Sequence, residues 1–330
     1  MTSAFGKVIL LGEHAVVHGH PALAAAIDRR VSVRAERRPS GPISLAIPRW
    51  NVSVAVGDAH PLAEVLAELA RQSGAEHLSL ALHARADLPP AAGLGSSAAT
   101  MVAVTRALAE AAGRPLASEE VEVIANAGER FFHANPSGID VALAARGGIG
   151  LYRRGAGLEP VAAAPPLTLA IGLSGEPRRT ADMVGRVAAE LAREPARTAA
   201  DLAQMGRAAE SAAAAWVDGR TADIAERMAR AQEILAGLGL STPAIDAMVD
   251  AALRAGASGA KLTGAGGGGA VIAVAPGRED DVLSAWRALG REAFTVTAGV
   301  PADDAAGRRG DSDVDTGGKI DGDIAGEIDR

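Results

Sequence analysis

The stretch Leu88–Thr100 reads LPPAAGLGSSAAT and stands directly before a long run of small apolar residues. The run from about Ser97 to Ala112 is apolar almost all round, which predicts a buried helix. Glycines let the backbone approach an anion, and a helix N-terminus offers unpaired N–H groups at a positive dipole end. Ser96 and Ser97 add hydroxyls that either cap the helix or reach a metal ion. The stretch indicates a phosphate-binding loop, with a flexible turn before an ordinary cap as the alternative.

Upstream, the stretch Phe5–Ile27 reads FGKVILLGEHAVVHGHPALAAAI. Its V-I-L-L segment predicts a buried strand, with Lys7 at the start and Glu13 and His14 just after the end. A charged group taken out of water costs on the order of several kcal/mol unless it is paired. We therefore expect partners for these charges elsewhere in the chain.

Downstream, the stretch Gly128–Asp140 reads GERFFHANPSGID. Glu129 lies near the end of one predicted helix and Asp140 in the first turn of the next, so the intervening turn could bring both carboxylates to one site. Magnesium takes one or two carboxylates together with hydroxyl and phosphate oxygens. A second carboxylate could accept a proton from a substrate hydroxyl. Taken alone, the pattern favours ordinary helix-end acids over a site.

A second glycine-rich stretch, Lys261–Ala270, reads KLTGAGGGGA. Three of its glycines satisfy G-x-G-x-x-G, but a dinucleotide fingerprint must follow a strand and open a helix. Here the stretch leads into a strand, A-V-I-A-V-A, so the dinucleotide interpretation fails. The chain also lacks the G-x-x-x-x-G-K-[ST] pattern of a Walker loop. Any phosphate must therefore be bound by a different architecture.

Composition restricts the class of protein. The chain has 330 residues with 48% apolar content, enough for two domains with their own cores. The net charge of −7 argues against a nucleic-acid binder, and no apolar run reaches the length of a membrane span. The absence of cysteine excludes disulfides and thiolate metal sites. We see no signal peptide, and we expect a cytoplasmic protein without nucleic-acid or membrane partners.

Strands and helices alternate along the chain, which predicts an α/β fold. Strands are predicted at 7–11, 31–37, 43–46, 78–84, 167–174, 270–275 and 294–298. Helices are predicted at 97–112, 118–133, 138–145 and 279–289, with a mainly helical segment at 180–256. A proline-rich stretch places a domain boundary near residue 163, which gives domains 1–163 and 164–300. Residues 301–330 are acidic and poor in apolar residues, which predicts a disordered tail.

The four motifs together, in this order, resemble those of the GHMP kinases, and among them the mevalonate kinases. The motifs are G-K-V-I-L-L-G-E-H-A-V-V-H-G, P-P-A-A-G-L-G-S-S-A-A, H-A-N-P-S-G-I-D and K-L-T-G-A-G-G-G-G. The resemblance covers about residues 1–300. Galactokinases carry an acidic and aromatic pair where this chain has Ala15 and Val16, and homoserine kinases lack P-S-G-I-D. Diphosphomevalonate decarboxylases lack the G-E-H-A-V-V-H-G pattern.

The resemblance implies an α/β (α+β) GHMP kinase fold. Its N-terminal domain would be ribosomal-protein-S5-like and its C-terminal domain ferredoxin-like, with the active site in the cleft between them. It further implies Mg²⁺-dependent phosphoryl transfer from ATP to the 5-hydroxyl of mevalonate, a step towards isoprenoids. A different small alcohol (phosphomevalonate, a sugar or homoserine) and an inactive metabolite-binding regulator remain as alternatives. The oligomeric state is open, with a homodimer as one option.

The resemblance also implies roles for single residues. Asp140 matches the catalytic aspartate and Lys7 the lysine beside it, while Ser97 and Glu129 match the magnesium ligands. The pocket for mevalonate would be lined by Glu13, His14 and Thr180. The ATP phosphates would lie on Pro90, Ala91, Ala92, Gly93, Leu94, Gly95, Ser96, Ser97, Ala98, Ala99 and Thr100. The second loop would contribute Gly264, Ala265, Gly266 and Gly267 on the phosphate side.

Overall fold

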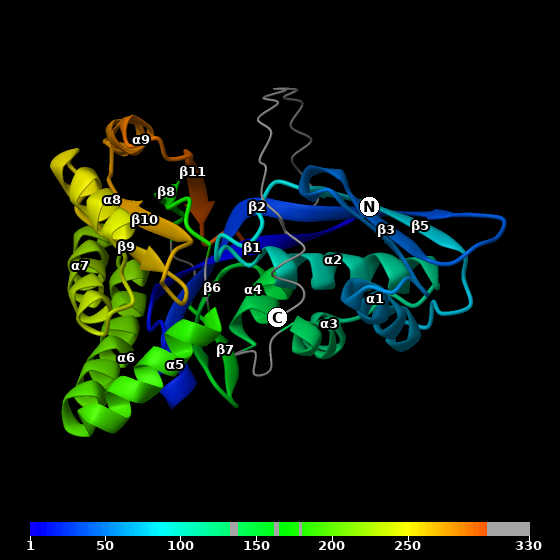
Figure 1. The fold of residues 1–330 in the computed structure, drawn as a ribbon, viewed down its shortest axis with the longest axis horizontal. Coiled ribbons are helices and arrows are strands. Elements are labelled where there is room, and N and C mark those ends of the chain that lie inside the picture. The colour runs from blue at the N-terminus through cyan, green and yellow to red at the C-terminus, as the bar shows by residue number, and fades with distance from the viewer. Residues whose placement is uncertain (133–137, 162–164, 178–179, 302–330) are drawn as a thin grey trace.

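The computed structural model describes residues 1–132, 138–161, 165–177 and 180–301 (Figure 1). One sheet runs through the described part with strand order β4-β3-β5-β2-β11-β8-β10-β9; β1 and β6 also pair with β2, and β7 pairs with β6. The strands are β1 (Thr2–Leu11), β2 (Ala22–Arg37), β3 (Ser44–Ile47), β4 (Val52–Ala55), β5 (Leu80–Ala86), β6 (Ile149–Arg153), β7 (Gly157–Pro160), β8 (Leu167–Leu173), β9 (Gly259–Thr263), β10 (Ala270–Val274) and β11 (Ala293–Ala298). The helices are α1 (Pro61–Gln72), α2 (Ser96–Ala111), α3 (Ser118–Phe132), α4 (Ile139–Arg146), α5 (Thr180–Arg193), α6 (Pro195–Val217), α7 (Thr221–Gly237), α8 (Pro243–Arg254) and α9 (Glu279–Ala288), with short 3-10 turns η1 (Ala15–His18) and η2 (Pro48–Trp50).

The N-terminal part is built around strand β2. This strand pairs with β1, β5 and β6 along its length and meets β11 at Ile27. Its first six residues are all buried, which suits the alanine-rich segment because small side chains let helices approach closely. Both α2 and α6 pack against this strand. The turn η1 leads the chain from β1 back into β2.

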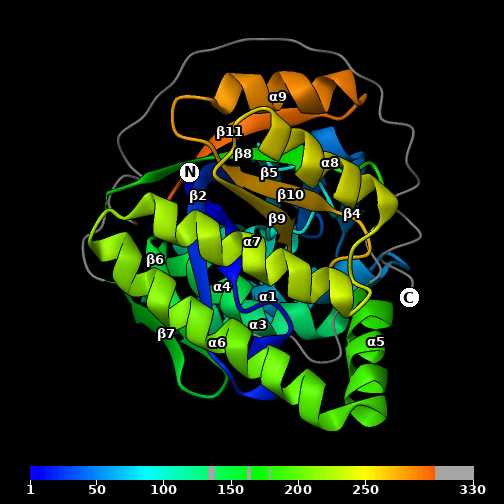
Figure 2. The ribbon, with the colours of Figure 1, turned by 90° about the vertical axis from the view of Figure 1, so that its left-hand side faces the viewer.

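The C-terminal part stacks helices on the strands β8, β9 and β10 (Figure 2). Helices α7 and α8 contact β9, while α9 contacts β8 and β11. Their apolar faces form a second hydrophobic cluster around Trp286, which is fully buried. Strand β11 lies between β8 and β2, so the last described strand joins the two parts into one sheet.

The structure confirms the α/β fold and the predicted strands and helices, with bounds that differ by a few residues. The strand predicted at 31–37 is the end of the longer β2. The structure also contains elements that the sequence did not predict, namely helix α1 and strands β4, β6, β7 and β9. The domain boundary near residue 163 and the tail from residue 302 lie outside the described residues, and both stay predictions. Within the described ranges, no helix is long and apolar enough to cross a membrane.

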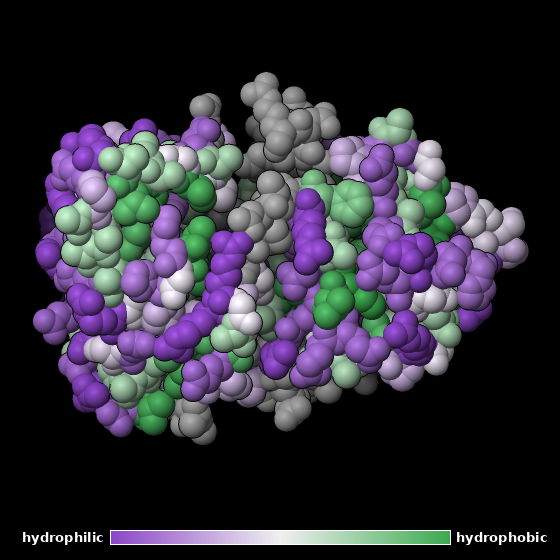
Figure 3. All heavy atoms as spheres, turned by 90° about the horizontal axis from the view of Figure 1, so that it is seen from below, coloured by the Kyte–Doolittle hydropathy of each residue, from purple (hydrophilic) through white to green (hydrophobic). Residues whose placement is uncertain are grey.

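The view from below shows polar and apolar residues mixed over the surface (Figure 3). Large exposed apolar side chains include Val123 and Phe131 on α3 and Val184 on α5. Scattered apolar residues of this kind are normal on soluble folds and do not by themselves mark a site.

Candidate functional site

Lys7 on β1 and Asp140 in the first turn of α4 form an ion pair. The Lys7 Nζ lies 3.1 Å from Asp140 Oδ1, and the two side chains are 2% and 36% exposed. The same ammonium donates a hydrogen bond of 3.1 Å to the carbonyl of Gly93. One cation therefore connects β1, the start of α4 and the loop Pro90–Thr100, which we call the Gly-Ser loop. The Asp140 carboxylate stays partly open to solvent.

The Gly-Ser loop between β5 and α2 is held against Lys7. The backbone N–H of Lys7 donates to Leu94 O at 2.9 Å. Ala91, Gly93 and Gly95 have positive φ values of 55°, 82° and 76°. A Cβ on Gly95 would lie 2.9 Å from Lys7 Cγ, so glycine is needed for both φ and space.

Helix α2 begins at Ser96 without a side-chain cap. Gly95 occupies the N-cap position and makes no side-chain hydrogen bond, so the expected alternative of a serine cap is wrong. Gly95 offers no side-chain acceptor to the first-turn N–H groups, which suits an anion site at a helix N-terminus. The predicted loop, Pro90–Thr100, forms this turn and the start of the helix.

Ser97 and Glu129, the two residues predicted to bind magnesium, lie together. The Ser97 hydroxyl donates to Glu129 Oε1, which links α2 to α3, and Glu129 is 4% exposed. A hydroxyl and a carboxylate beside a phosphate loop are suitable ligands for a hard cation. Among the described residues, no group of three or more His, Cys, Asp or Glu side chains could form a metal cage by itself. Phosphate oxygens would therefore have to complete the coordination.

Glu13 and His14 follow β1 and face the second glycine-rich loop. Glu13 pairs with Lys261 on β9, and both side chains are fully buried. The His14 Nε2 lies 2.8 Å from Ala265 O, so this nitrogen donates. Burial raises the pKa of Glu13, although the nearby Lys261 and Lys7 ammonium groups oppose the change. Burial lowers the pKa of His14, which favours the neutral ring.

The second loop, residues 264–269, is a tight glycine turn between β9 and β10. Gly264, Gly266 and Gly267 have φ values of 86°, 81° and 68°. A Cβ on Gly268 would lie 2.7 Å from Glu176 O, and one on Gly267 would lie 2.7 Å from Met183 Sδ. The loop is thus packed between the end of β8 and the start of α5.

Thr180 begins α5 at one side of this loop. Met183, one turn later, touches the loop at Gly267. Thr180 and Met183 are three positions apart on α5, a spacing that puts two side chains near one another on a helix surface. Thr180 thus begins the helix that packs on the second loop through Met183, and its place in a substrate pocket stays a prediction.

The sequence interpretation missed Lys261 and Thr263. The five residues of β9 are all buried, and Lys261 carries a charge among them. The argument that singled out Lys7, a lysine in an apolar strand that needs a partner, applies equally to Lys261. Thr263 gave no such signal, because its hydroxyl bonds to the backbone of Ile9 and not to another side chain.

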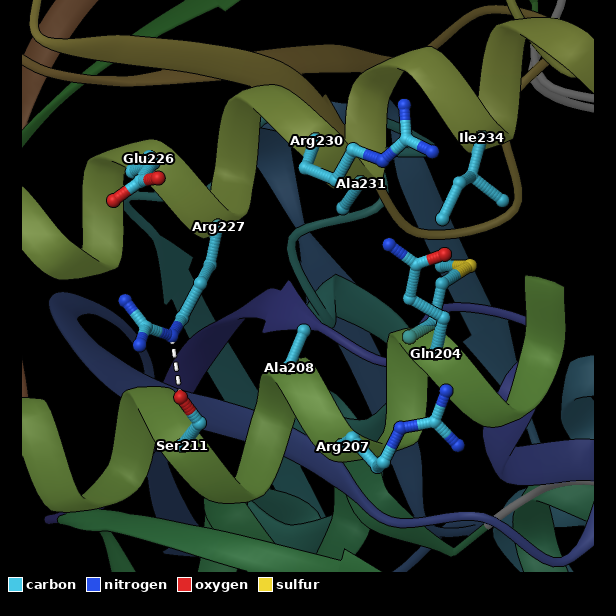
Figure 4. A pocket seen from close by; sticks show the side chains of 10 residues that line it. Gln204, Arg207, Ala208, Ser211, Glu226, Arg227, Arg230, Ala231 and Ile234 are labelled. Carbon is cyan, nitrogen blue, oxygen red and sulfur yellow. Dashed lines mark hydrogen bonds between the residues drawn. The ribbon is translucent and has the colours of Figure 1, made fainter. Parts of the chain in front are cut away.

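A separate groove of about 370 Å³ lies between α6 and α7 (Figure 4). Arg207, Arg227 and Arg230 line it, and Arg227 donates to Ser211 across the two helices. None of the predicted site residues is among the residues that line this groove. The groove is therefore distinct from the Lys7–Asp140 site.

The chain is similar to known proteins over most of its length. The N-terminal domain of the GHMP kinases matches residues 60–148, and their C-terminal domain matches residues 207–292. The mevalonate kinase of Aeropyrum pernix is 38% identical over 82% of this chain and 86% of its own length. The mevalonate kinase of Pyrococcus horikoshii is 34% identical over 88% of this chain and 92% of its own.

Solved structures agree with these sequence relatives. A structure of L. major mevalonate kinase in complex with R-mevalonate has a TM-score of 0.79 and 27% identity, and the match covers 91% of this chain and 96% of that one. The Methanococcus jannaschii mevalonate kinase also has a TM-score of 0.79, at 23% identity and with 90% and 97% of the two chains covered. The second likeness supports the fold alone.

Proposed function

This chain belongs to the mevalonate kinase family of the GHMP kinases, and from that membership we propose that it phosphorylates mevalonate with ATP. One observation carries the proposal. The Lys7 ammonium binds both Asp140 and the Gly93 carbonyl of the Gly-Ser loop. A cation is thereby held where a phosphate loop meets a partly exposed carboxylate, which is the arrangement that phosphoryl transfer needs.

In the proposed reaction, the 5-hydroxyl oxygen of mevalonate attacks the γ-phosphorus of ATP. The bond from that phosphorus to the bridging oxygen breaks, ADP leaves, and the hydroxyl proton passes to the Asp140 carboxylate. Lys7 stabilises negative charge on the moving phosphoryl group. Most of the acceleration comes from aligning the two substrates, which the rigid loop and strand contacts supply.

The ATP phosphates would lie against the loop Pro90–Thr100 and the uncapped start of α2. Glu13, His14 and Thr180 would line the mevalonate pocket, with Gly264–Gly267 on its phosphate side. The buried, neutral His14 ring and the buried Glu13 carboxylate suit a polar hydroxy acid better than an apolar ligand. We further propose that the protein works in the cytoplasm, and its oligomeric state is a matter for measurement.

Magnesium is the metal that we propose for this site. Ser97 and the buried Glu129 fit the hydroxyl and carboxylate ligands that Mg²⁺ accepts beside phosphate oxygens. The ion would neutralise charge on the phosphates of ATP. The hydrogen bond between Ser97 and Glu129 orients the two ligands from adjacent helices before any ion binds.

A coupled assay for ADP release tests the proposal. Purified protein is given ATP and Mg²⁺ with mevalonate, phosphomevalonate, galactose or homoserine in turn. We expect ADP release with mevalonate, and the Asp140→Asn variant serves as the control for a contaminating kinase. Turnover with another alcohol but not with mevalonate would make the substrate assignment wrong. Binding of mevalonate without turnover of any alcohol would instead favour an inactive regulator.

A further inference from the structure

We propose that Lys261 is a positioning residue for the acceptor substrate, because it fixes the Glu13 carboxylate and leaves one of its oxygens to accept a hydrogen bond from a hydroxyl of that substrate other than the reacting one. The inference rests on the proposed function, since it deepens the description of the same site. It adds a residue that acts through Glu13 and does not touch the reacting atoms.

The contacts of the pair leave one buried carboxylate oxygen without a hydrogen-bond partner among the described residues. The Lys261 Nζ donates to Glu13 Oε1 and, at 2.6 Å, to the carbonyl of Leu262. Glu13 Oε2 is buried and has no hydrogen-bond partner among the described residues. Buried polar atoms are nearly always paired, so an orphaned carboxylate oxygen in a site is a natural acceptor for a ligand donor.

Charges around Glu13 connect it to the reaction centre. Lys261 faces it from β9, Lys7 lies close enough on β1 to stabilise its anion, and His14 is its neighbour in the turn. Lys7 also holds Asp140. The carboxylate of Glu13 is therefore paired with one ammonium group, Lys261, and is also stabilised by the charge of a second, Lys7, which belongs to the proposed catalytic pair.

The use of lysine in this chain supports a dedicated role. Of 33 lysines and arginines, only Lys7, Lys261 and Lys319 are lysines. The two in the described part are both buried, and each ammonium binds one carboxylate and one backbone carbonyl. A guanidinium has five donors in a rigid plane, whereas an ammonium is a compact charge with three. Both buried lysine positions in the described part therefore carry the more compact cation.

Strand β9 gives Lys261 a rigid base. Residues 261, 263 and 265 alternate along the chain, and each contacts the segment around β1. Lys261 binds Glu13, Thr263 binds Ile9, and the Ala265 carbonyl accepts from His14. Residues 261 and 263 are alternate positions within β9 and so share one face of the strand, and through them this face holds β1 at Ile9 and the turn after it at Glu13.

The experiment compares Lys261→Met, Lys261→Arg, Glu13→Gln and the double variant Glu13→Gln/Lys261→Met with wild type. Acceptor KM, ATP KM, kcat and Tm are measured well below the lowest Tm, and Kd for mevalonate is measured by calorimetry. We expect Lys261→Met to raise the acceptor KM and Kd about tenfold or more and to change the ATP KM less than twofold. In the Glu13→Gln background the same substitution should add little, because Lys261 acts through Glu13.

The pH profile provides a readout that a purely structural role would not move. Without the Lys261 ammonium, the pKa of Glu13 rises further, so the acid limb of kcat/KM for the acceptor should shift to higher pH. Lys261→Arg retains the charge and should shift the limb less. Met248→Ala, a cavity variant in the second hydrophobic cluster around Trp286, controls for lost stability and should leave the acceptor KM unchanged.

Three results would overturn the inference. One is a Lys261→Met variant with a lower Tm but a wild-type acceptor KM and acid limb, which would make the pair structural. A second is an equal rise of acceptor KM in the Glu13→Gln background. The third, a wild-type protein that neither binds nor turns over mevalonate, would also make the proposed function wrong, whereas the first two leave that function intact.

Discussion

The hydroxyl of Thr263 completes both backbone hydrogen bonds of Ile9. It accepts from the Ile9 N–H at 3.0 Å and donates to the Ile9 carbonyl at 2.9 Å. These residues are 254 positions apart in the chain. A single side chain thus provides at this point of β1 the two bonds that a neighbouring strand would provide, and it ties the end of β9 to the strand that carries Lys7.

Thr263→Val should destabilise the protein by about 1–3 kcal/mol, because it leaves a buried N–H and carbonyl without partners. Thr263→Ser keeps the hydroxyl and loses one methyl group, which should cost about 1 kcal/mol or less. Urea unfolding of the two variants measures the difference. An equal loss in both would show that packing of the methyl group, and not the double hydrogen bond, is what matters.

Gly95→Ala should lower kcat, because the added Cβ would displace the Lys7 side chain from Asp140. The matched control is Gly74→Ala. Gly74 has nearly the same φ, 75° against 76°, but nothing lies within 4 Å of its missing Cβ. Both variants should lose about 1–2 kcal/mol of stability from the left-handed backbone, and only Gly95→Ala should lose activity. Activity assays together with thermal melts separate the two effects. Wild-type turnover by Gly95→Ala would mean that Lys7 tolerates displacement.

Asp140→Asn should lower kcat by roughly 10²- to 10⁴-fold if the carboxylate accepts the substrate proton. The amide has the same shape, so nucleotide affinity and Tm should stay close to wild type. Asp250→Asn, at an exposed position on α8, is the control for loss of a carboxylate elsewhere. The measurements are kcat, nucleotide Kd and a thermal melt for each variant. Turnover near the wild-type rate would make Asp140 structural.

His14 should make the folded state sensitive to acid. Burial lowers the pKa of its ring below the usual 6.5. The unfolded state then binds a proton that the folded state does not, so this contribution to stability is present above pH 6.5 and is lost as pH falls towards the folded pKa. His14→Asn, which also tolerates the φ of 59°, should lose less stability than wild type between pH 7.5 and 5.5.

Urea unfolding at the two pH values checks this prediction, with up to about 1.4 kcal/mol per pH unit at stake for one proton. His83→Asn is the control, because that ring is 59% exposed and is hydrated in both states. If the free energy of unfolding of His14→Asn fell between pH 7.5 and 5.5 by as much as that of wild type and of His83→Asn, His14 would not be the group responsible for the acid sensitivity.

Much of the candidate site could be named from the sequence because its residues lie in short motifs. Ser97 follows a glycine loop and Asp140 opens a helix after a turn, and the resemblance of these motifs to those of a known family, more than their spacing alone, singled them out. Lys261 could not be assigned in this way, because its partner Glu13 is 248 residues away and only the folded sheet brings them together. The position of β11 between β2 and β8 is non-local for the same reason.

Local propensity also misled the interpretation at Ala22–Ile27. Alanine is a weak strand former, so the segment carried no strand signal. In the structure it is the fully buried start of β2, where small side chains allow α2 and α6 to pack closely. Tertiary packing decided the conformation of this segment, and that packing cannot be read from the segment itself.

Because lysine is scarce in this chain, cleavage after lysine can report how often the folded protein opens locally. A protease that cleaves only after lysine finds two of its three sites, Lys7 and Lys261, inside the fold, at 2% and 0% exposure. Cleavage at either site requires the chain to open around the proposed active centre, so the rate of cutting follows the population of opened molecules when reclosing is fast. Bound substrates should slow that cutting, and the digestion pattern would then reveal ligand binding without a label or an activity assay.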